Sequence, residues 1–382
     1  MDQGKSLDAA TRKVVLVGGG HAHALVLRSW AKTPLPNAEI TVINPSQTAP
    51  YTGMLPGFIA GHYSRDQLDY SLVELTKPAN TKLVVGKATG IDRNTKTIAV
   101  EGHPPIEYDI CSINVGVTSA IPDLPGFDRH RFGVNAKPLG PLATQWTSFV
   151  ENCASSPKVP DVCVIGGGVA GCELAMAMSY RLSQDGHRPV VNVIERQVAL
   201  SEVNPGTRKK LAQVMNDLDI VIHEHAKVES VLSDHLTLST DGESAKRLPA
   251  DFIVCAAGAR PLPWLETIGL KLTNGFIDIS ETLQSITDPD IFAVGDCAHM
   301  PFAPRPKAGV FAVRQAPFLK LNIEARLQDA ELRPFSPQSD YLKLVSLGKR
   351  SAGAEKFGRF TSGPAMWRLK DRIDKKFMDS LG

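Results

Sequence analysis

The sequence lacks long hydrophobic runs and has few aromatic residues. No uninterrupted apolar stretch approaches the roughly 20 residues that cross a bilayer, and the polar start at 1–13 lacks the apolar core of a signal peptide. Aromatic residues make up 6% of the chain. They are too rarely interleaved with basic residues to indicate nucleic-acid binding. We therefore expect a protein that is soluble or peripheral to a membrane, with no nucleic-acid partner.

Paired cysteines are also missing. The six cysteines, at 111, 153, 163, 172, 255 and 297, include no C-x-x-C pair, and several fall in predicted strands or helices. A cysteine in such a place usually behaves as a small hydrophobe. The spacing argues against a disulfide framework and favours a reducing, cytoplasmic setting. The His-x-His pairs lack further ligands at metal-binding spacing, so we predict no metal site.

The most informative features present are two glycine-rich fingerprints, Val14–His23 and Val162–Gly171. Each has a β-branched run, a tight glycine turn and then a stretch with helical character. In such a motif the first glycine (Gly18, Gly166) allows the turn and the next (Gly20, Gly168) lets backbone approach a pyrophosphate. The helix N-terminus then offers N–H groups and a positive dipole end to the phosphates. Two such motifs predict two dinucleotides held by two domains.

The two halves resemble each other beyond these turns. A predicted strand follows each fingerprint, and later an Asp is followed by an apolar strand that closes on a glycine, at Asp109–Gly116 and Asp251–Gly258. This pattern indicates internal duplication of one α/β unit. A third strand ends in Gly295-Asp296, which predicts a carboxylate at the carboxyl edge of a sheet, where open α/β sheets bind ligands.

Proline-rich stretches at 121–126, 137–141 and 157–160 surround the second fingerprint and indicate crossings between domains. A helix is predicted over Ala308–Leu327, and 334–382 is expected to form a small C-terminal unit.

On these residues the chain resembles the pyridine nucleotide-disulfide oxidoreductase superfamily, flavoproteins with two dinucleotide-binding domains. Within it, the loop Pro50–Pro56 and the segment Gly171–Leu174 resemble type II NADH dehydrogenases. Together, Gly18–His23, Tyr51–Gly57 and Trp367–Asp374 resemble a narrower branch, whose flavoprotein module is often fused to selenide, water dikinase.

The resemblance implies an α/β fold with two Rossmann-like domains, the nicotinamide domain being inserted into the flavin domain, and a small C-terminal α+β unit. It implies FAD on 1–123 and 275–331, NAD(P)H on 124–274, and an interface or membrane-facing segment at 332–382. The FAD candidates are Gly18, Gly20, His21, Asn44, Thr52, Gly116, Gly295 and Asp296. The NADH candidates are Gly166, Gly168, Gly171, Glu195 and Gly258.

Glu195 closes the second strand of the nicotinamide unit. A carboxylate there accepts hydrogen bonds from both ribose hydroxyls and repels a 2′-phosphate, which favours NADH over NADPH. The alternatives are a solvated strand-end acid, or a site governed by the neighbouring Arg196. The equivalent residue in the first half is Asn44, an uncharged amide. His23 stands where the third glycine is expected, and it either contacts the pyrophosphate or fills a wider gap between helix and strand.

Glu173 is the catalytic candidate, since the resemblance implies a Glu near nicotinamide and flavin. The alternative is a Glu that stabilises the first helical turn through the dipole.

The segment Ser46–Leu55 has no cysteine and no cysteine follows Cys297, which argues against disulfide reductases and sulfide:quinone reductases. Electrons would then leave the flavin directly, to a quinone or another small acceptor, and the resemblance points to Arg314 and Gln315 for the acceptor site. We predict an FAD-dependent NADH oxidoreductase. The alternatives are a reductase of a selenium or sulfur species, and an NADH-binding redox-sensing or scaffold flavoprotein.

Near the C-terminus, Met366, Leu369, Ile373, Phe377 and Leu381 recur at helical spacing. Basic residues surround this stripe (Arg368, Lys370, Arg372, Lys375 and Lys376), with Trp367 beside it. Such a helix suits an anionic membrane interface. The alternative is that the stripe packs on the flavin domain or on a partner subunit.

Overall fold

The structure, a computed structural model, describes residues 11–120, 124–127, 132–240 and 245–382. Most of the polar N-terminal stretch, and 121–123 within the proline-rich stretch at 121–126, lie outside the described residues. In the described parts of the chain, no helix has the length and apolar character needed to span a membrane.

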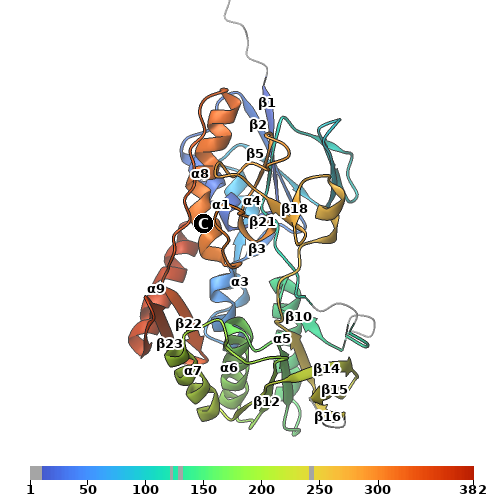
Figure 1. Cartoon of the computed structure of the whole chain (residues 1–382), viewed down its shortest axis with the longest axis vertical. Coiled ribbons are helices and arrows are strands. Elements are labelled where there is room, and N and C mark those ends of the chain that lie inside the picture. Colours follow the sequence, from blue (N-terminus) through green and yellow to red (C-terminus); the bar gives the residue numbers. More distant parts are fainter. Residues whose placement is uncertain (1–10, 121–123, 128–131, 241–244) are drawn as a thin grey trace, which may run out of the picture.

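Two five-stranded parallel sheets organise the molecule, one in each of two lobes (Figure 1). The first lobe is built on the sheet ordered β20-β9-β1-β2-β5, and the second lobe on the sheet ordered β10-β17-β11-β12-β13. The first sheet contains β1 (Arg12–Val17), β2 (Ala38–Asn44), β5 (Thr81–Val85), β9 (Ile110–Ile113) and β20 (Ile291–Ala293). The second contains β10 (Val134–Asn135), β11 (Asp161–Ile165), β12 (Val190–Ile194), β13 (Ile220–His223) and β17 (Phe252–Cys255).

Equivalent strands occupy equivalent places in the two sheets. In each, the strand before the glycine turn (β1, β11) lies between the next strand along the chain (β2, β12) and the later Asp-to-Gly strand (β9, β17). This is the arrangement that the predicted duplication requires. The outer strand β20 of the first sheet follows all five strands of the second sheet in the sequence. The α/β fold class is therefore as predicted, while the domain limits at 123/124, 274/275 and 331/332 stay predictions.

Helices cover the sheets. In the first lobe α1 (His21–Lys32) packs on α8 (Gly309–Leu327), and the second lobe carries α5 (Leu139–Ala154), α6 (Val169–Gln184) and α7 (Pro205–Asp217) (Figure 1). The shorter helices are α2 (Leu55–Ile59), α3 (Arg65–Leu68), α4 (Leu72–Thr76) and the 3₁₀ turns η1 (Thr52–Met54), η2 (Pro263–Thr267) and η3 (Gly295–Cys297).

Smaller sheets complete the lobes. They are the pair β3 (Thr48–Pro50) and β4 (Asp69–Ser71); the sheet of β6 (Ala88–Asp92), β7 (Thr97–Val100) and β8 (Ile106–Glu107); the sheet of β14 (Ala226–Val231), β15 (His235–Thr240) and β16 (Lys246–Pro249); and the sheet of β18 (Leu272–Thr273), β19 (Phe276–Asp278) and β21 (Ala298–His299).

The C-terminal unit joins the two lobes. It consists of the antiparallel sheet β22 (Lys343–Leu347), β23 (Lys349–Lys356) and β24 (Arg359–Gly363), followed by α9 (Pro364–Asp379). β22 packs on α6 of the second lobe, and α9 lies across β23 and runs up the side of the molecule towards the first lobe (Figure 1).

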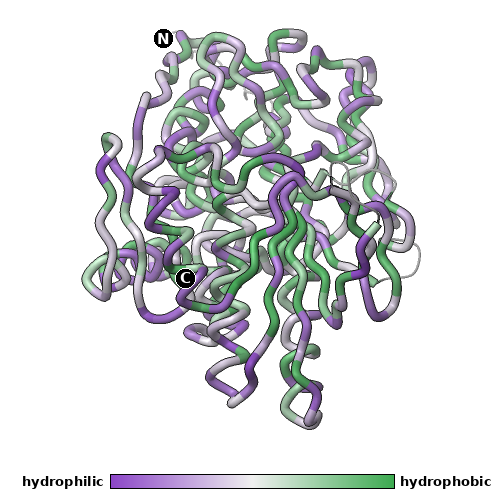
Figure 2. Tube along the Cα trace, turned by 60° about the horizontal axis from the view of Figure 1, so that its bottom comes forward, coloured by the Kyte–Doolittle hydropathy of each residue, from purple (hydrophilic) through white to green (hydrophobic). Residues whose placement is uncertain are grey.

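Hydrophobic segments of the strands and helices run side by side in the interior, and hydrophilic segments follow much of the periphery (Figure 2). One buried cluster fills the first lobe between its sheet, α1 and α8. A second cluster fills the second lobe and includes α2 and Trp367 of α9, although α2 comes from the first half of the chain. The packing of α2 and α9 there couples the two lobes.

The expected apolar stripe of α9 is divided between the protein and the surface. Leu381 is buried and Met366 and Phe377 pack against the core, but Leu369 and Ile373 are 37% and 44% exposed. The buried face instead contains Trp367 and two charged residues that form an ion pair, Lys370 and Asp374. The prediction that Lys370 is an interfacial cation was wrong, because its partner four residues on allows it to be buried.

Candidate functional site

The first glycine turn is held by side chains from neighbouring strands. Gly18 has a φ of +92°, in the left-handed region that favours glycine. The Gly19 amide donates to the Asn44 side-chain oxygen at 2.9 Å, and the Tyr70 hydroxyl donates to the Gly19 carbonyl at 2.7 Å. Asn44 also donates to the Ser46 carbonyl. The amide at the end of β2 therefore fixes the shape of the turn.

The second glycine turn repeats this arrangement with a charged residue. Gly166 has a φ of +111°, and the Gly167 amide donates to Glu195 Oε2 at 2.8 Å. Glu195 Oε1 accepts from the Gln197 amide at 2.8 Å. Glu195 and Asn44 therefore occupy matching positions. The second lobe has a carboxylate where the first lobe has an uncharged amide.

The third fingerprint position differs between the lobes. A Cβ on Gly171 would lie 1.9 Å from the Gly166 carbonyl oxygen, so the close approach of α6 to its turn excludes any side chain. In the matching place His23 is fully buried, with Nδ1 2.6 Å from the Gly18 carbonyl oxygen and Nε2 2.8 Å from Ser112 Oγ. Of the two alternatives for His23, the structure favours the one in which the ring fills a wider gap between helix and strand.

Asn114 is a site residue that the sequence reasoning missed. Its side-chain oxygen accepts from the amides of Ala22 and His23, and its Nδ2 donates to the Val294 carbonyl at 3.0 Å. It thus joins the start of α1 to the ends of β9 and β20. A polar residue directly after the buried strand Ile110–Ile113 was the available signal.

Asp296 lies at the carboxyl end of β20, in η3, and forms an ion pair with Lys137 at 2.7 Å. Gly295 before it has a φ of +72°, and its amide donates to Gln315 at 2.8 Å. The other strand-end glycine of this lobe, Gly116, is exposed, and nothing lies within 4 Å of the place of its Cβ. A carboxylate, a lysine and open backbone thus lie at the carboxyl edge of the first sheet, where ligands bind to α/β folds.

His21 begins α1 and is buried beside aromatic rings. Its ring centroid lies 5.1 Å from that of Tyr51 and 5.6 Å from that of Phe377, and those two rings stack at 4.4 Å. Burial lowers the pKa of His21 to about 4, against the opposing effect of Asp296. The imidazole is therefore neutral at pH 7, and any contact it makes with a phosphate is that of a neutral donor.

Glu173 does not lie in the first turn of its helix, contrary to one of the two explanations offered for it. α6 begins at Val169, so Glu173 is in the second turn, where the N-terminal dipole has little effect. Its carboxylate accepts from the Ser346 amide of β22. Burial raises the pKa of Glu173 to about 7, and Lys370 and the Ser346 amide oppose that rise.

Lys370 and Asp374 are further residues that sequence reasoning did not identify as site residues. Lys370 Nζ donates to the Gly53 carbonyl oxygen at 2.5 Å and to Asp374 at 2.7 Å. Both side chains are more than 90% buried. They lie between the loop Pro50–Pro56 of the first lobe and Glu173 of the second. The geometry creates a buried group of two carboxyls and one ammonium where the lobes meet.

The remaining predicted residues are less closely grouped. Gln315 is 1% exposed and contacts Gly295 and Met300, so it supports the Gly295 turn, and its place in an acceptor site stays a prediction. Arg314 has a buried Nη1 without a hydrogen-bond partner among the described residues. Thr52 lies in η1 and faces the start of α8, since a Cβ on Gly309 would lie 3.3 Å from Thr52 Oγ1. Gly258, with a φ of +55°, lies at the chain crossing beside Ala120.

The structure describes all six cysteines, which are buried and form no disulfide with one another. Burial raises the pKa of Cys172 to about 12 and that of Cys297 to about 11. A thiol with such a pKa is almost entirely protonated at pH 7 and is a poor nucleophile.

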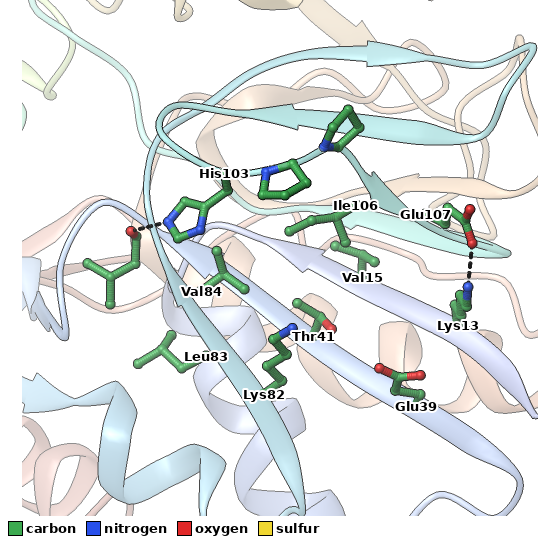
Figure 3. A pocket seen from close by; sticks show the side chains of 13 residues that line it. Lys13, Val15, Glu39, Thr41, Lys82, Leu83, Val84, His103, Ile106 and Glu107 are labelled. Atoms are coloured by element: carbon green, nitrogen blue, oxygen red, sulfur yellow. Dashed lines mark hydrogen bonds and ion pairs between the residues drawn. The ribbon is translucent and has the colours of Figure 1, made fainter.

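A cavity of about 500 Å³ lies elsewhere, between the first sheet and the segment His103–Glu107 (Figure 3). Lys13, Glu39 and Lys82 line it from the early parts of β1, β2 and β5, away from the glycine turn. None of the predicted site residues lines it. A hollow of about 20 Å³ does adjoin Asp296, Gly295 and Gln315.

Comparison with known proteins agrees with this geometry. The family model described as pyridine nucleotide-disulphide oxidoreductase matches residues 12–316. A type II NADH:quinone oxidoreductase of Staphylococcus saprophyticus is 23% identical, covering 97% of this chain and 96% of the relative. The demethylphylloquinone reductase NdbB of Synechocystis is 24% identical, covering 94% and 90%.

Solved structures have the same fold. The sulfide:quinone oxidoreductase of Aquifex aeolicus has a TM-score of 0.81 at 18% identity, covering 97% of this chain and 91% of that one. NDH2 of Plasmodium falciparum, in complex with NADH, has a TM-score of 0.80 at 16% identity, covering 97% of both chains. The narrower resemblance to flavoproteins fused to selenide, water dikinase has no support among these relatives.

The match over most of the chain, the two parallel sheets and their paired glycine turns together show that this chain belongs to the pyridine nucleotide-disulphide oxidoreductase family, as predicted.

Proposed function

We propose that the chain oxidises NADH with a bound FAD and passes the electrons to a quinone. The observation that carries this is the pair of matched glycine turns, one fastened by the neutral Asn44 and the other by the carboxylate of Glu195. Relatives named type II NADH:quinone oxidoreductase and demethylphylloquinone reductase support the choice of substrates.

The first lobe fits FAD. At the start of α1, Asn114 accepts from the amides of Ala22 and His23. The preceding amide, that of His21, has no protein acceptor among the described residues. That amide, Gly18 and Gly20 would hold the pyrophosphate, Asn44 the adenosine ribose and Asp296 the ribityl chain, with Thr52 and Gly116 adjoining. FAD when bound supplies the redox chemistry, accepting hydride from NADH and passing electrons on.

The second lobe would hold NADH. Gly166, Gly168 and Gly171 shape the cradle, and Gly258 lies at the end of the neighbouring strand. Glu195 is half-buried beside the turn, where its charge favours two ribose hydroxyls and repels a 2′-phosphate. Arg196 is exposed.

Glu173 is the proton-holding residue in this proposal. With a pKa raised to about 7, its carboxyl is able to hold and release a proton near neutral pH. Reduction of a quinone to a quinol takes up two protons, and an acid with a pKa near the working pH is best suited to deliver one. Lys370 positions the Gly53 loop and restrains the rise in the pKa of Glu173.

Arg314 and Gln315 are the candidates for the acceptor site, and Arg314 is favoured because its buried Nη1 lacks a partner in the described structure. The proposal includes no thiol relay, since all six cysteines are buried and none forms a disulfide with another. The acceptor would therefore take its electrons from the cofactor directly.

We further propose that α9 touches a membrane through its outward face. Arg368, Arg372 and Lys376 are exposed at steps of four residues, beside the exposed pair Leu369 and Ile373. A row of cations next to apolar side chains suits an anionic lipid surface. Such contact would bring the enzyme to a membrane quinone.

The whole proposal is tested by steady-state turnover. Purified protein should be yellow, release FAD on denaturation, and oxidise NADH at about 1 s⁻¹ or faster only when a quinone such as menadione is added. A colourless protein that does not take up FAD contradicts the scheme. NADH oxidation that no quinone in a panel accelerates contradicts the choice of acceptor.

Glu195 should set the preference between the two nicotinamide cofactors. We expect kcat/KM for NADH to exceed that for NADPH by at least about tenfold, or roughly 1.4 kcal/mol. Glu195→Gln removes the charge that repels the 2′-phosphate and should reduce the ratio to below about threefold. Arg196→Gln is the control, and should leave the ratio unchanged. If Arg196→Gln alone weakens NADPH use and Glu195→Gln has no effect, Arg196 governs the site.

The pH dependence of quinone reduction should depend on Glu173. Below its pKa of about 7 the group holds a proton, so the rate should fall as the pH rises through about 7. Glu173→Gln should lower kcat by about a hundredfold and remove this inflection.

Lys370→Met, checked for normal FAD content, should move the inflection to higher pH, because the ammonium opposes the rise in the pKa of Glu173. An unchanged inflection in Glu173→Gln would assign the proton to another group.

Membrane contact is measured by co-sedimentation with anionic liposomes at low salt. The double variant Leu369→Gln/Ile373→Gln should lose most of the bound fraction. The matched control is Leu232→Gln/Ile286→Gln, a leucine and an isoleucine that are 41% and 46% exposed elsewhere. Equal losses in both variants, or no binding of the unaltered protein, would show that α9 is not the contact.

A further inference from the structure

One carboxylate occupies the start of the helix that follows the second glycine turn. The amide of Val169, the first residue of α6, donates to Glu202 Oε1 at 2.5 Å. Amides at this position have no acceptor within their own helix, and together with the helix dipole they attract anions. In the fingerprint these are the groups that face a dinucleotide's pyrophosphate.

The first lobe lacks this contact. In both lobes the amide of the middle glycine is taken by the strand-end side chain, Asn44 for Gly19 and Glu195 for Gly167. The amide of His21, which matches Val169, has no protein acceptor among the described residues. Comparison of the two duplicated turns therefore shows that the Glu202 contact is present in the second lobe and has no counterpart in the described part of the first lobe.

Glu202 lies between two fixed points of the loop that joins β12 to α7. On one side, Leu200 is 1% exposed and its amide donates to the Gly167 carbonyl at 2.8 Å. On the other, Asn204 caps α7 by accepting from the Thr207 amide at 2.9 Å. Glu202 itself is exposed, so its side chain is able to turn into solvent while both anchors stay in place.

The contact also depends on Gly168. A Cβ at that position would lie 2.9 Å from Glu202 Oε1, closer than a Cβ tolerates. The bare glycine that lets a pyrophosphate approach thus also lets the carboxylate approach. The two anions cannot share one amide, because both are negative and both need the same N–H.

We propose that Glu202 competes with the dinucleotide pyrophosphate for the start of α6, so that NADH and NAD⁺ bind only after its carboxylate has swung out. This rests on the proposed function, in which the second glycine turn holds NADH. The carboxylate lowers the affinity for reduced and oxidised dinucleotide alike. It also returns to the Val169 amide once the product has left.

The test measures binding rather than turnover. ADP-ribose carries the pyrophosphate without the nicotinamide, and its Kd for the FAD-loaded enzyme is obtained by titration calorimetry. Glu202→Gln keeps the size of the side chain and removes its charge. We expect this variant to bind ADP-ribose about three- to tenfold more tightly, as suits the loss of one charge at a helix N-terminus. Normal FAD content shows that the variant is folded.

Glu151→Gln is the matched control. Glu151 is exposed on α5 of the same lobe, so its removal changes the net charge equally without touching the cradle. An unchanged or weaker Kd in Glu202→Gln, or the same gain in Glu151→Gln, overturns the competition. If the unaltered enzyme and both variants bind neither ADP-ribose nor NAD⁺, the proposed nucleotide site itself is wrong.

Discussion

The structure depends on how closely each first helix approaches the glycine turn before it. At the carboxyl end of a parallel strand the chain must reverse within three residues and still present backbone amides outward. In the second lobe this is achieved by bare backbone contact, with Gly171 against the Gly166 carbonyl. In the first lobe an imidazole is inserted at the same place and makes two hydrogen bonds. Both solutions leave the turn in the same shape, and the strand-end side chains Asn44 and Glu195 then fasten it.

A second constraint comes from the C-terminal unit. Its sheet rests on α6, its helix α9 reaches the loop Pro50–Pro56, and a buried ion pair lies at the junction. Burying two charges is costly unless each is paired and hydrogen-bonded. Here Lys370 has both Asp374 and the Gly53 carbonyl as partners. The unit therefore fixes the position of the loop in the first lobe relative to Glu173 in the second.

Local features of this chain could be predicted from its sequence and long-range ones could not. Gly18 and Gly166 were identifiable because turn chemistry depends on adjacent residues, and the strands beside them on β-branched runs. Lys370 could not be placed at the site, because its hydrogen-bond partner Gly53 is 317 residues away in the sequence. Periodicity correctly predicted α9 as a helix, but it cannot tell which face is covered when the covered face contains an ion pair. Gln315 was predicted on the right helix, and the direction of its side chain depends on the Gly295 turn.

His21 and His23 also make the stability of the first lobe sensitive to acid. The second lobe has Val169 and Gly171 at the matching positions, which do not titrate. Burial lowers the pKa of both His21 and His23 from 6.5 to about 4. Because the unfolded chain binds these protons more readily, the stability they support is full above about pH 6.5 and is lost as the pH falls towards 4. A shift of this size corresponds to about 3 kcal/mol for each residue. The lobe closed by Gly171 has no titrating group at that position, so the acid sensitivity that comes with an inserted imidazole belongs to the first lobe.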